Sequence, residues 1–264
     1  MPAPPDLYQQ AALDAAARAY APYSGRQVGT VLVLADGTWV PGVRVENASF
    51  GLTISALLNA YTTLRTAQRN DLVGVVHSHP LQPDEEAFLQ ATPPGSWTAD
   101  TLRAWRSRDH PWPTPTSPLN PFLPGPLPKE PEAGLARARR VAEGAFIPES
   151  DFPVGCLIAT DEGPLVPGVN VEHADWSRIL CAERTALSTA VTYGVTPRTV
   201  YVSCPLDPTG SPCGACRQVL VEQAAGTIVW QDRGPAPALR TSPEALLPHS
   251  FQGQPLRTHP TSTR

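Results

Sequence analysis

The order of apolar and polar positions along the chain is the same in its two halves. In each half a short apolar run, a turn containing glycine and a second apolar run precede a segment whose apolar residues recur every three or four positions. Short apolar runs bounded by turn residues predict strands, and the longer spacing predicts a helix. Each half is therefore expected to form a helix, a strand hairpin, a second helix and a third strand. The expected strands are 28–35, 39–45, 72–76, 154–160, 165–171, 199–203 and 227–231, and the expected helices are 9–20, 54–68, 133–143, 180–193 and 214–224.

A single offset of 126 residues aligns the halves, as the pair Glu46 and Glu172 shows. The same offset places VPGV at 40–43 opposite VPGV at 166–169, with several prolines, glycines and alanines matching nearby. Identities this dense indicate an internal repeat rather than two unrelated units that share turn glycines. The sequence thus predicts two copies of one α/β unit, with helices packed on a mixed sheet.

Proline interrupts the pattern between the halves. The chain has 32 prolines, and PWPTPTSPLNPFLPGPLPKEP occupies 111–131. Because proline lacks a backbone donor and fixes φ, this stretch is expected to be extended. The sequence therefore predicts domains at 1–92 and 133–264 and a proline-rich linker at 93–132, in which 97–108 could form a short helix.

Composition excludes several classes of protein. The 264 residues carry 20 Lys and Arg against 24 Asp and Glu, a net charge of −4, which argues against a nucleic acid partner. Apolar runs are far shorter than the roughly 20 residues of a membrane span. The start, MPAPPDLYQQ, lacks the basic and apolar regions of a signal peptide. We expect a cytoplasmic protein without membrane contact, in which five cysteines favour metal binding or catalysis over disulfides.

Three cysteines of the second half have metal-ligand spacing. Cys181 opens the sequence CAE, and Cys213 and Cys216 belong to the later sequence PCGAC. The expected helices place them at helix N-termini, where the partial positive charge favours thiolates. Three protein ligands leave the fourth position of a zinc ion open, which is typical of a catalytic site. A structural zinc that has lost a ligand and a reduced apolar trio are the alternative interpretations.

Both halves resemble the cytidine deaminase family. In the second half the resemblance covers about 152–251, through FPVG, GVNVEHA, CAERTAL, PCGACRQ and LLPHSF, and in the first half about 20–64, through APYS and GVRVENASFGL. It implies two tandem three-layer α/β/α domains, each with a mixed sheet of about five strands, and one Zn²⁺ per chain. It also implies hydrolytic deamination of cytidine and deoxycytidine to uridine and deoxyuridine, a step of pyrimidine salvage, with a nucleoside as the small-molecule partner.

The resemblance also assigns roles to residues of the second half. Glu183 would carry a proton from the attacking water to the pyrimidine, and Arg184 would hydrogen-bond the sulfurs of the metal ligands. The implied zinc ligands are Cys181, Cys213 and Cys216. The implied contacts to the base and to the ribose hydroxyls are, respectively, Phe152 and the pair Asn170 and Glu172.

The segment that follows the expected strand 165–171 departs from the family pattern. It reads EHADW at 172–176, where ENAS is frequent in the family. This departure leaves open a deaminase that acts on another aminopyrimidine nucleoside. A second alternative is a catalytically silent pseudo-deaminase that binds nucleosides or a protein partner.

The first half lacks the chemical groups of the second. At the 126-residue offset, positions 181, 183, 152 and 170 become Ser55, Leu57, Arg26 and Arg44. An adjusted alignment of the later loop puts Asp84 and Ala87 opposite the other two cysteines. We therefore expect a folded first domain without zinc. The HSHP sequence at 77–80 resembles part of a protease zinc motif, but the required serine and aspartate are missing beyond it.

Assembly is also implied by the resemblance. Small cytidine deaminases are tetramers whose sites borrow residues from neighbouring subunits, so a homodimer of this tandem chain would form a pseudo-tetramer. Phe50 in the first half and Phe251 near the C-terminus are candidates to cover the pocket of a neighbouring domain or chain.

Overall fold

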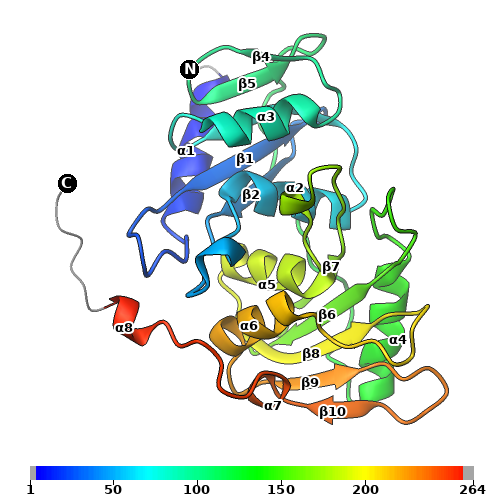
Figure 1. Cartoon of the computed structure of the whole chain (residues 1–264). Helices are drawn as coiled ribbons and strands as arrows, with labels where there is room; N and C mark the ends of the chain where they lie inside the picture. The colour runs from blue at the N-terminus through cyan, green and yellow to red at the C-terminus, as the bar shows by residue number, and fades with distance from the viewer. Residues whose placement is uncertain (1–3, 258–264) are drawn as a thin grey trace.

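The computed structural model describes residues 4–257 and contains two five-stranded sheets, one from each half (Figure 1). The elements of the first half are α1 (Pro4–Ala16), β1 (Gly29–Leu34), β2 (Trp39–Val43), η1 (Phe50–Leu52), α2 (Ala56–Thr66), β3 (Leu72–His77), α3 (Pro83–Ala91), β4 (Trp97–Ala99) and β5 (Ala104–Ser107). Their sheet has the order β2-β1-β3-β5-β4, and each neighbouring pair is antiparallel.

The second half repeats this beginning and then diverges. Its elements are α4 (Pro131–Ala142), β6 (Gly155–Thr160), β7 (Leu165–Val169), η2 (Trp176–Arg178), α5 (Ala182–Tyr193), β8 (Pro197–Ser203), α6 (Gly214–Gln223), β9 (Ile228–Gln231), β10 (Leu239–Thr241), α7 (Pro243–Leu246) and α8 (Gln254–Arg257). The sheet order is β10-β9-β8-β6-β7, with β8 and β9 parallel and the other pairs antiparallel. No described helix is long and apolar enough to cross a membrane.

The prediction of two α/β units with five strands each is confirmed, but the first sheet is antiparallel rather than mixed. In the second half, helix α6 carries the chain from β8 back to a parallel neighbour, β9. In the first half, the strand that follows α3 occupies the edge, and its hairpin partner β5 returns antiparallel beside β3. The topology of the two copies therefore separates after their third strands.

The predicted linker at 93–132 begins too early, and the helix expected at 97–108 is wrong. This segment forms the hairpin of β4 and β5, because Trp97 is buried in the core of the first half. The proline-rich stretch that follows is extended and lies along both sheets. Pro118 bridges Trp39 of β2, and Leu123 bridges Leu165 of β7. The stretch thus joins the edge strands of the two sheets.

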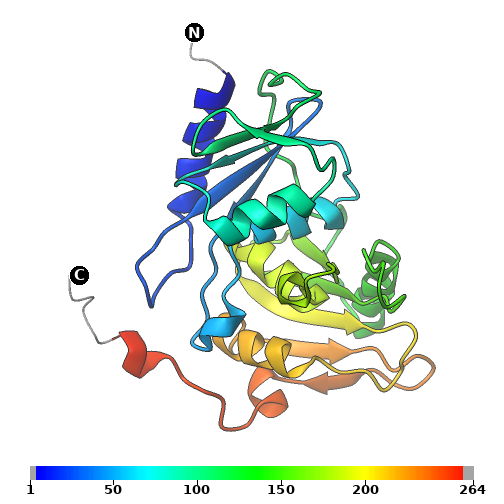
Figure 2. The ribbon, with the colours of Figure 1, turned by 45° about the horizontal axis from the view of Figure 1, so that its top comes forward.

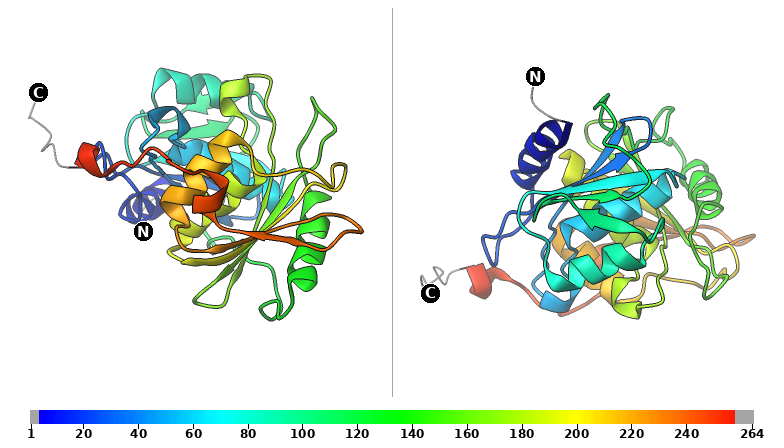
Figure 3. Two further views of the ribbon diagram at one scale, coloured as in Figure 1. Left: turned by 60° about the horizontal axis from the view of Figure 1, so that its bottom comes forward. Right: turned by 90° about the horizontal axis from the view of Figure 1, so that it is seen from above.

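Each sheet has a helix on its outer face, α1 on the first and α4 on the second (Figures 2 and 3). Glycine allows this helix to lie directly on the first strand. A Cβ atom at Gly29 would lie 2.3 Å from the carbonyl oxygen of Ala12, and one at Gly155 would lie 2.1 Å from that of Ala138. These matched close approaches explain why the repeat retains glycine at both positions.

Helices α2 and α5 pack against each other between the two sheets. The hydroxyls of Thr63 and Thr189, which are 126 residues apart, lie 2.9 Å from each other. Asn59 of α2 donates hydrogen bonds to the carbonyl oxygen of Ser188, at 3.3 Å, and to the hydroxyl of Thr192, at 2.8 Å. Contact between equivalent threonines places an approximate two-fold axis here, and the halves share one buried core across it.

Substitution of Gly155 by alanine tests the close approach of helix and strand. The new methyl group would overlap the backbone of α4, so we expect a loss of about 1–3 kcal/mol in the free energy of unfolding, measured by chemical denaturation. Gly51→Ala is the matched control, because a Cβ at Gly51 meets nothing within 4 Å. That control should stay within about 0.5 kcal/mol of the parent. Equal stability of the two variants would contradict the role given to Gly155.

Candidate active site

Three cysteine side chains meet where α5 and α6 begin. Cys181 is the N-cap of α5, Cys213 is the N-cap of α6, and Cys216 lies in the first turn of α6. The Sγ atoms of Cys181 and Cys213 are 3.6 Å apart, and all three sulfurs lie within 4.8 Å of one another. Within residues 4–257 this is the one cluster of three or more potential metal ligands that the structure forms. The sequence prediction that these residues converge is met by the geometry.

The electrostatics of the trio favour a bound cation. Hydrogen bonds from the other two thiols lower the pKa of Cys213. Hydrogen bonding and burial raise the pKa of Cys181 and of Cys216. The thiolate form is therefore favoured at Cys213 and disfavoured at the other two cysteines. Three sulfur donors around one point, with no fourth His, Cys, Asp or Glu of the described residues in the cluster, fit a zinc ion that keeps one position open.

Glu183 lies beside the sulfurs, in the first turn of α5. Its side chain is buried, and the thiol of Cys216 donates to its Oε2 atom at 3.4 Å. Burial raises the pKa of this carboxyl group. A carboxyl group that is enclosed next to a metal-binding cluster can hold and release a proton there without serving as a ligand.

Arg184 points to the other half of the chain. It donates from Nη2 to the carbonyl oxygen of Leu52 in η1, at 3.1 Å, and its buried Nε atom has no hydrogen-bond partner within the described residues. The described hydrogen bonds of Arg184 do not include one to the cysteine sulfurs, so the role that the family resemblance implies for it stays a prediction. The first half therefore contacts the helix that begins at the cluster.

Two of the residues expected to bind substrate, Asn170 and Glu172, hold the loop at 149–154 in place. Asn170 accepts from the backbone N–H of Val154, at 2.8 Å, and donates to the carbonyl oxygen of Phe152, at 2.9 Å. The carboxylate of Glu172 accepts from the backbone N–H groups of Glu149 and Ser150 and from the Ser150 hydroxyl. Phe152 itself is 37% exposed. The two polar residues therefore position the loop that presents this phenylalanine.

The first half keeps the local backbone of the site but not its chemistry. Ser55 is the N-cap of α2 and accepts from the N–H of Leu58, at 3.2 Å. The residues at the cap and third positions of α3 are Gln82 and Glu85. These, rather than Asp84 and Ala87, are the helix-position counterparts of Cys213 and Cys216. The sequence alignment of this loop was wrong by two residues, because α3 begins earlier than the spacing suggested.

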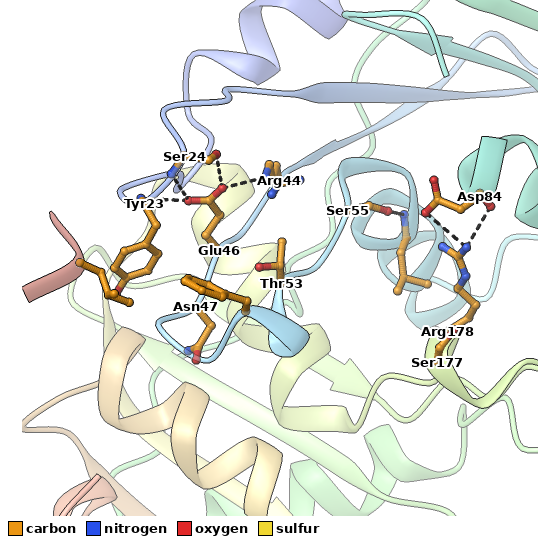
Figure 4. Close-up of a pocket in the computed structure, with 13 residues that line it drawn as sticks. Tyr23, Ser24, Arg44, Glu46, Asn47, Thr53, Ser55, Asp84, Ser177 and Arg178 are labelled. Atoms are coloured by element: carbon orange, nitrogen blue, oxygen red, sulfur yellow. Dashed lines mark hydrogen bonds and ion pairs between the residues drawn. The ribbon is translucent and has the colours of Figure 1, made fainter. Parts of the chain in front are cut away.

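A cavity of about 670 Å³ lies between the first half and η2 of the second (Figure 4). Glu46 accepts there from the backbone of Tyr23 and Ser24 and from Arg44. Phe50, one of the two proposed covering residues, is 67% exposed and lines this cavity.

Phe251, the other proposed covering residue, is 58% exposed. Its carbonyl oxygen accepts from Gln218 of α6, at 3.0 Å. Coverage of a neighbouring pocket by either phenylalanine stays a prediction.

Sequence reasoning missed one connection to the site. Glu222, at the far end of α6 from the cysteines, accepts from the hydroxyls of Tyr20 and Tyr23 and from the N–H of Ala48, at 3.1, 2.7 and 2.8 Å. All three donors belong to the first half. Because Glu222 lies beyond the aligned part of the repeat, the offset gave no signal for it. The helix that carries Cys213 and Cys216 is thus anchored to the other half.

The fold and the cysteine cluster together define a zinc-binding α/β protein. Two models described as "Cytidine and deoxycytidylate deaminase zinc-binding region" match residues 128–231 and 4–79. The chain is 35% identical over 124 residues to the cytidine deaminase of Sporosarcina psychrophila. The aligned segment covers 46% of this chain and 91% of that protein. The chain is 34% identical over 124 residues to the enzyme of Halalkalibacterium halodurans, at 46% and 92% coverage.

Among solved structures, the cytidine deaminase of Burkholderia pseudomallei is 35% identical, covers 46% of this chain and 98% of its own, and has a TM-score of 0.42. The chain belongs to the cytidine deaminase family and contains two deaminase regions in tandem. The resemblance stated from the sequence is confirmed, as is zinc binding, which the zinc-binding regions and the cysteine cluster support together.

Substitution of Glu222 by alanine tests how firmly α6 is anchored. The change leaves three donors of the first half without their acceptor, so we expect the free energy of unfolding to fall by about 1–3 kcal/mol in urea denaturation. Glu143→Ala removes an exposed carboxylate at the end of α4 and serves as the control. It should change stability by less than about 0.5 kcal/mol. If both variants unfold like the parent, Glu222 does not tie the halves together.

Proposed function

We propose that this protein is a zinc-dependent hydrolase that converts cytidine and deoxycytidine to uridine and deoxyuridine with release of ammonia. One observation carries the proposal: a three-cysteine cluster with the buried carboxyl group of Glu183 next to it, in a chain of the cytidine deaminase family. A zinc ion held by the three thiolates supplies activation of a water molecule at neutral pH. Pyrimidine salvage in the cytoplasm is the setting that such a reaction suits.

Glu183 is the proton carrier in this proposal. Its Oε2 atom lies at the cluster rather than in solvent, so it can accept the proton of the attacking water. The same carboxyl group then protonates N3 of the pyrimidine. It takes a second proton from the hydroxyl group added at C4 and passes it to the amine, so that the C4–N bond breaks and ammonia leaves a C4 carbonyl.

The substrate would lie between the cluster and the loop that carries Phe152. In this proposal Phe152 stacks on the pyrimidine, and Asn170 and Glu172 bind the ribose hydroxyls while they hold the loop. Arg184 reduces the negative charge of the three thiolates, acting from its position against Leu52. These assignments follow the family resemblance and the loop geometry described above.

We also propose an organisation of the chain into two domains. We assign residues up to Ser107 to the first deaminase domain, since β4 and β5 complete its sheet, and residues from Pro131 to the second. The pairing of α2 with α5 joins two such domains within one chain. A homodimer of tandem chains would then resemble a tetramer of single domains, with Phe50 and Phe251 covering neighbouring pockets.

A related substrate is the second candidate, and the altered segment after β7 favours it. The ring of His173 packs on Phe88 of α3, with the ring centroids 5.2 Å apart. Asp175 lies 3.5 Å from Arg178 of η2, which in turn lies 3.4 Å from Asp84 of α3. This segment is therefore shaped by contacts with the first half. Another aminopyrimidine nucleoside is the substrate class that such a change at the pocket edge would select.

Replacement of Glu183 by glutamine tests the proposed chemistry. The amide keeps the size of the side chain but cannot carry the proton, so kcat should fall by about 10²–10⁴-fold or more. Zinc content should be unchanged, since Glu183 is not a ligand. Turnover is followed by ultraviolet absorbance and ammonia release with cytidine, deoxycytidine, cytosine and other aminopyrimidine nucleosides.

The exposed Glu143→Gln variant is the matched control and should retain full activity. Unchanged turnover of Glu183→Gln would remove this residue from the mechanism. Activity on other aminopyrimidine nucleosides but not on cytidine would favour the second candidate.

A further inference from the structure

The first half contains a second cavity at the position of the lost active site. This cavity of about 550 Å³, here called the first-half cavity, is lined by helix-start, loop and strand residues that include Arg26, Arg44, Ser55, His77, Gln82 and Glu85. Several of them occupy positions equivalent to functional residues of the second half. The space that would hold the zinc and the base there is therefore present here with a different lining.

The lining of this cavity carries more basic groups than the corresponding part of the catalytic half. The second half has Cys181 and Cys213 at the positions of Ser55 and Gln82. It has the Glu183 carboxyl group at the position of Leu57. Arg26 and Arg44 stand where it has Phe152 and Asn170. The exchange removes two of the three cysteines and the Glu183 carboxyl group and adds two guanidinium groups. One acidic group remains, Glu85, at the position of Cys216.

Glu85 is the acidic residue that lines the cavity, and its surroundings weaken its charge. Its carboxyl group is buried, accepts from the backbone N–H of Gln82 at 3.2 Å and lies 3.6 Å from Nε2 of His77. Burial raises the pKa of Glu85. The buried His77 is held on its other side by the Thr30 hydroxyl, at 2.5 Å. Glu85 and His77 thus form an ordered polar pair in the lining of the cavity.

Both arginines have guanidinium N–H groups that donate to no described residue. Arg44 uses Nε to bind Glu46, at 2.9 Å, and its other two guanidinium nitrogens have no hydrogen-bond partner within residues 4–257. The guanidinium group of Arg26 is exposed at the cavity and likewise lacks a protein partner in the described part of the chain. Guanidinium groups with free N–H donors match the oxygens of phosphate in geometry and charge.

The first-half cavity also has room for more than an inorganic ion. Arg44 and Ser55 line both it and the neighbouring cavity of about 670 Å³ that Figure 4 shows. Each of the two cavities falls in the size range of small-molecule sites. We propose that the first half is a binding site for a phosphate group, either as free phosphate or as part of a small phosphate ester, with Arg26 and Arg44 as its anion contacts. This site does not depend on the proposed deamination.

Titration calorimetry of the full-length, zinc-loaded protein tests the site with three probes: inorganic phosphate, ribose 5-phosphate and uncharged ribose. Both phosphate probes should bind saturably and ribose should not. The Arg26→Gln variant should lower the association constant for phosphate probes by about tenfold or more, as loss of a charge-assisted donor group predicts. Tighter binding of ribose 5-phosphate than of phosphate would identify an ester as the ligand, and equal binding would identify the phosphate group alone.

Two variants serve as controls. Arg26→Lys keeps the charge and should lose less affinity than Arg26→Gln. Arg240→Gln removes an exposed arginine from β10, in the other sheet, and should bind like the parent. Because Arg26 is exposed, its substitution should not alter thermal unfolding. Absence of saturable phosphate binding, or equal affinity of the parent and Arg26→Gln, would overturn the proposal.

Discussion

The packing of α2 against α5 holds the two halves of the molecule together. Thr63 and Thr189 touch across the approximate two-fold axis, and Asn59 reaches over it to α5. Because each helix also covers the inner face of its own sheet, the two halves share apolar core and cannot part without exposing it. The first half therefore stays necessary to the fold after its chemistry has gone.

This packing explains why the first half can lack the catalytic residues at little cost in stability. Ser55 caps α2 at the position where Cys181 caps α5, so the helix starts in the same way. Leu57 is buried where Glu183 is buried, and an apolar side chain there avoids the desolvation of a carboxyl group. The first half retains its role as the partner surface for α5 and α6, through the contacts of Leu52 with Arg184 and of Ala48 with Glu222.

Features encoded locally were accessible from the sequence, and features set by distant contacts were not. The apolar periods gave the hairpins and the helices α2 and α5, and the spacing of Cys181, Cys213 and Cys216 gave the metal cluster. The hairpin of β4 and β5 was missed because its stability comes from pairing with β3 and from burial of Trp97. No local sequence pattern indicates either of these contacts. The same is true of Glu222, whose three partners lie in the other half of the chain.

X-ray absorption at the zinc edge of the full-length protein measures the asymmetry between the halves. We expect one zinc per chain, with three sulfur neighbours and one lighter donor that comes from solvent. Two zinc ions per chain, or a single ion with four protein ligands, would contradict this expectation.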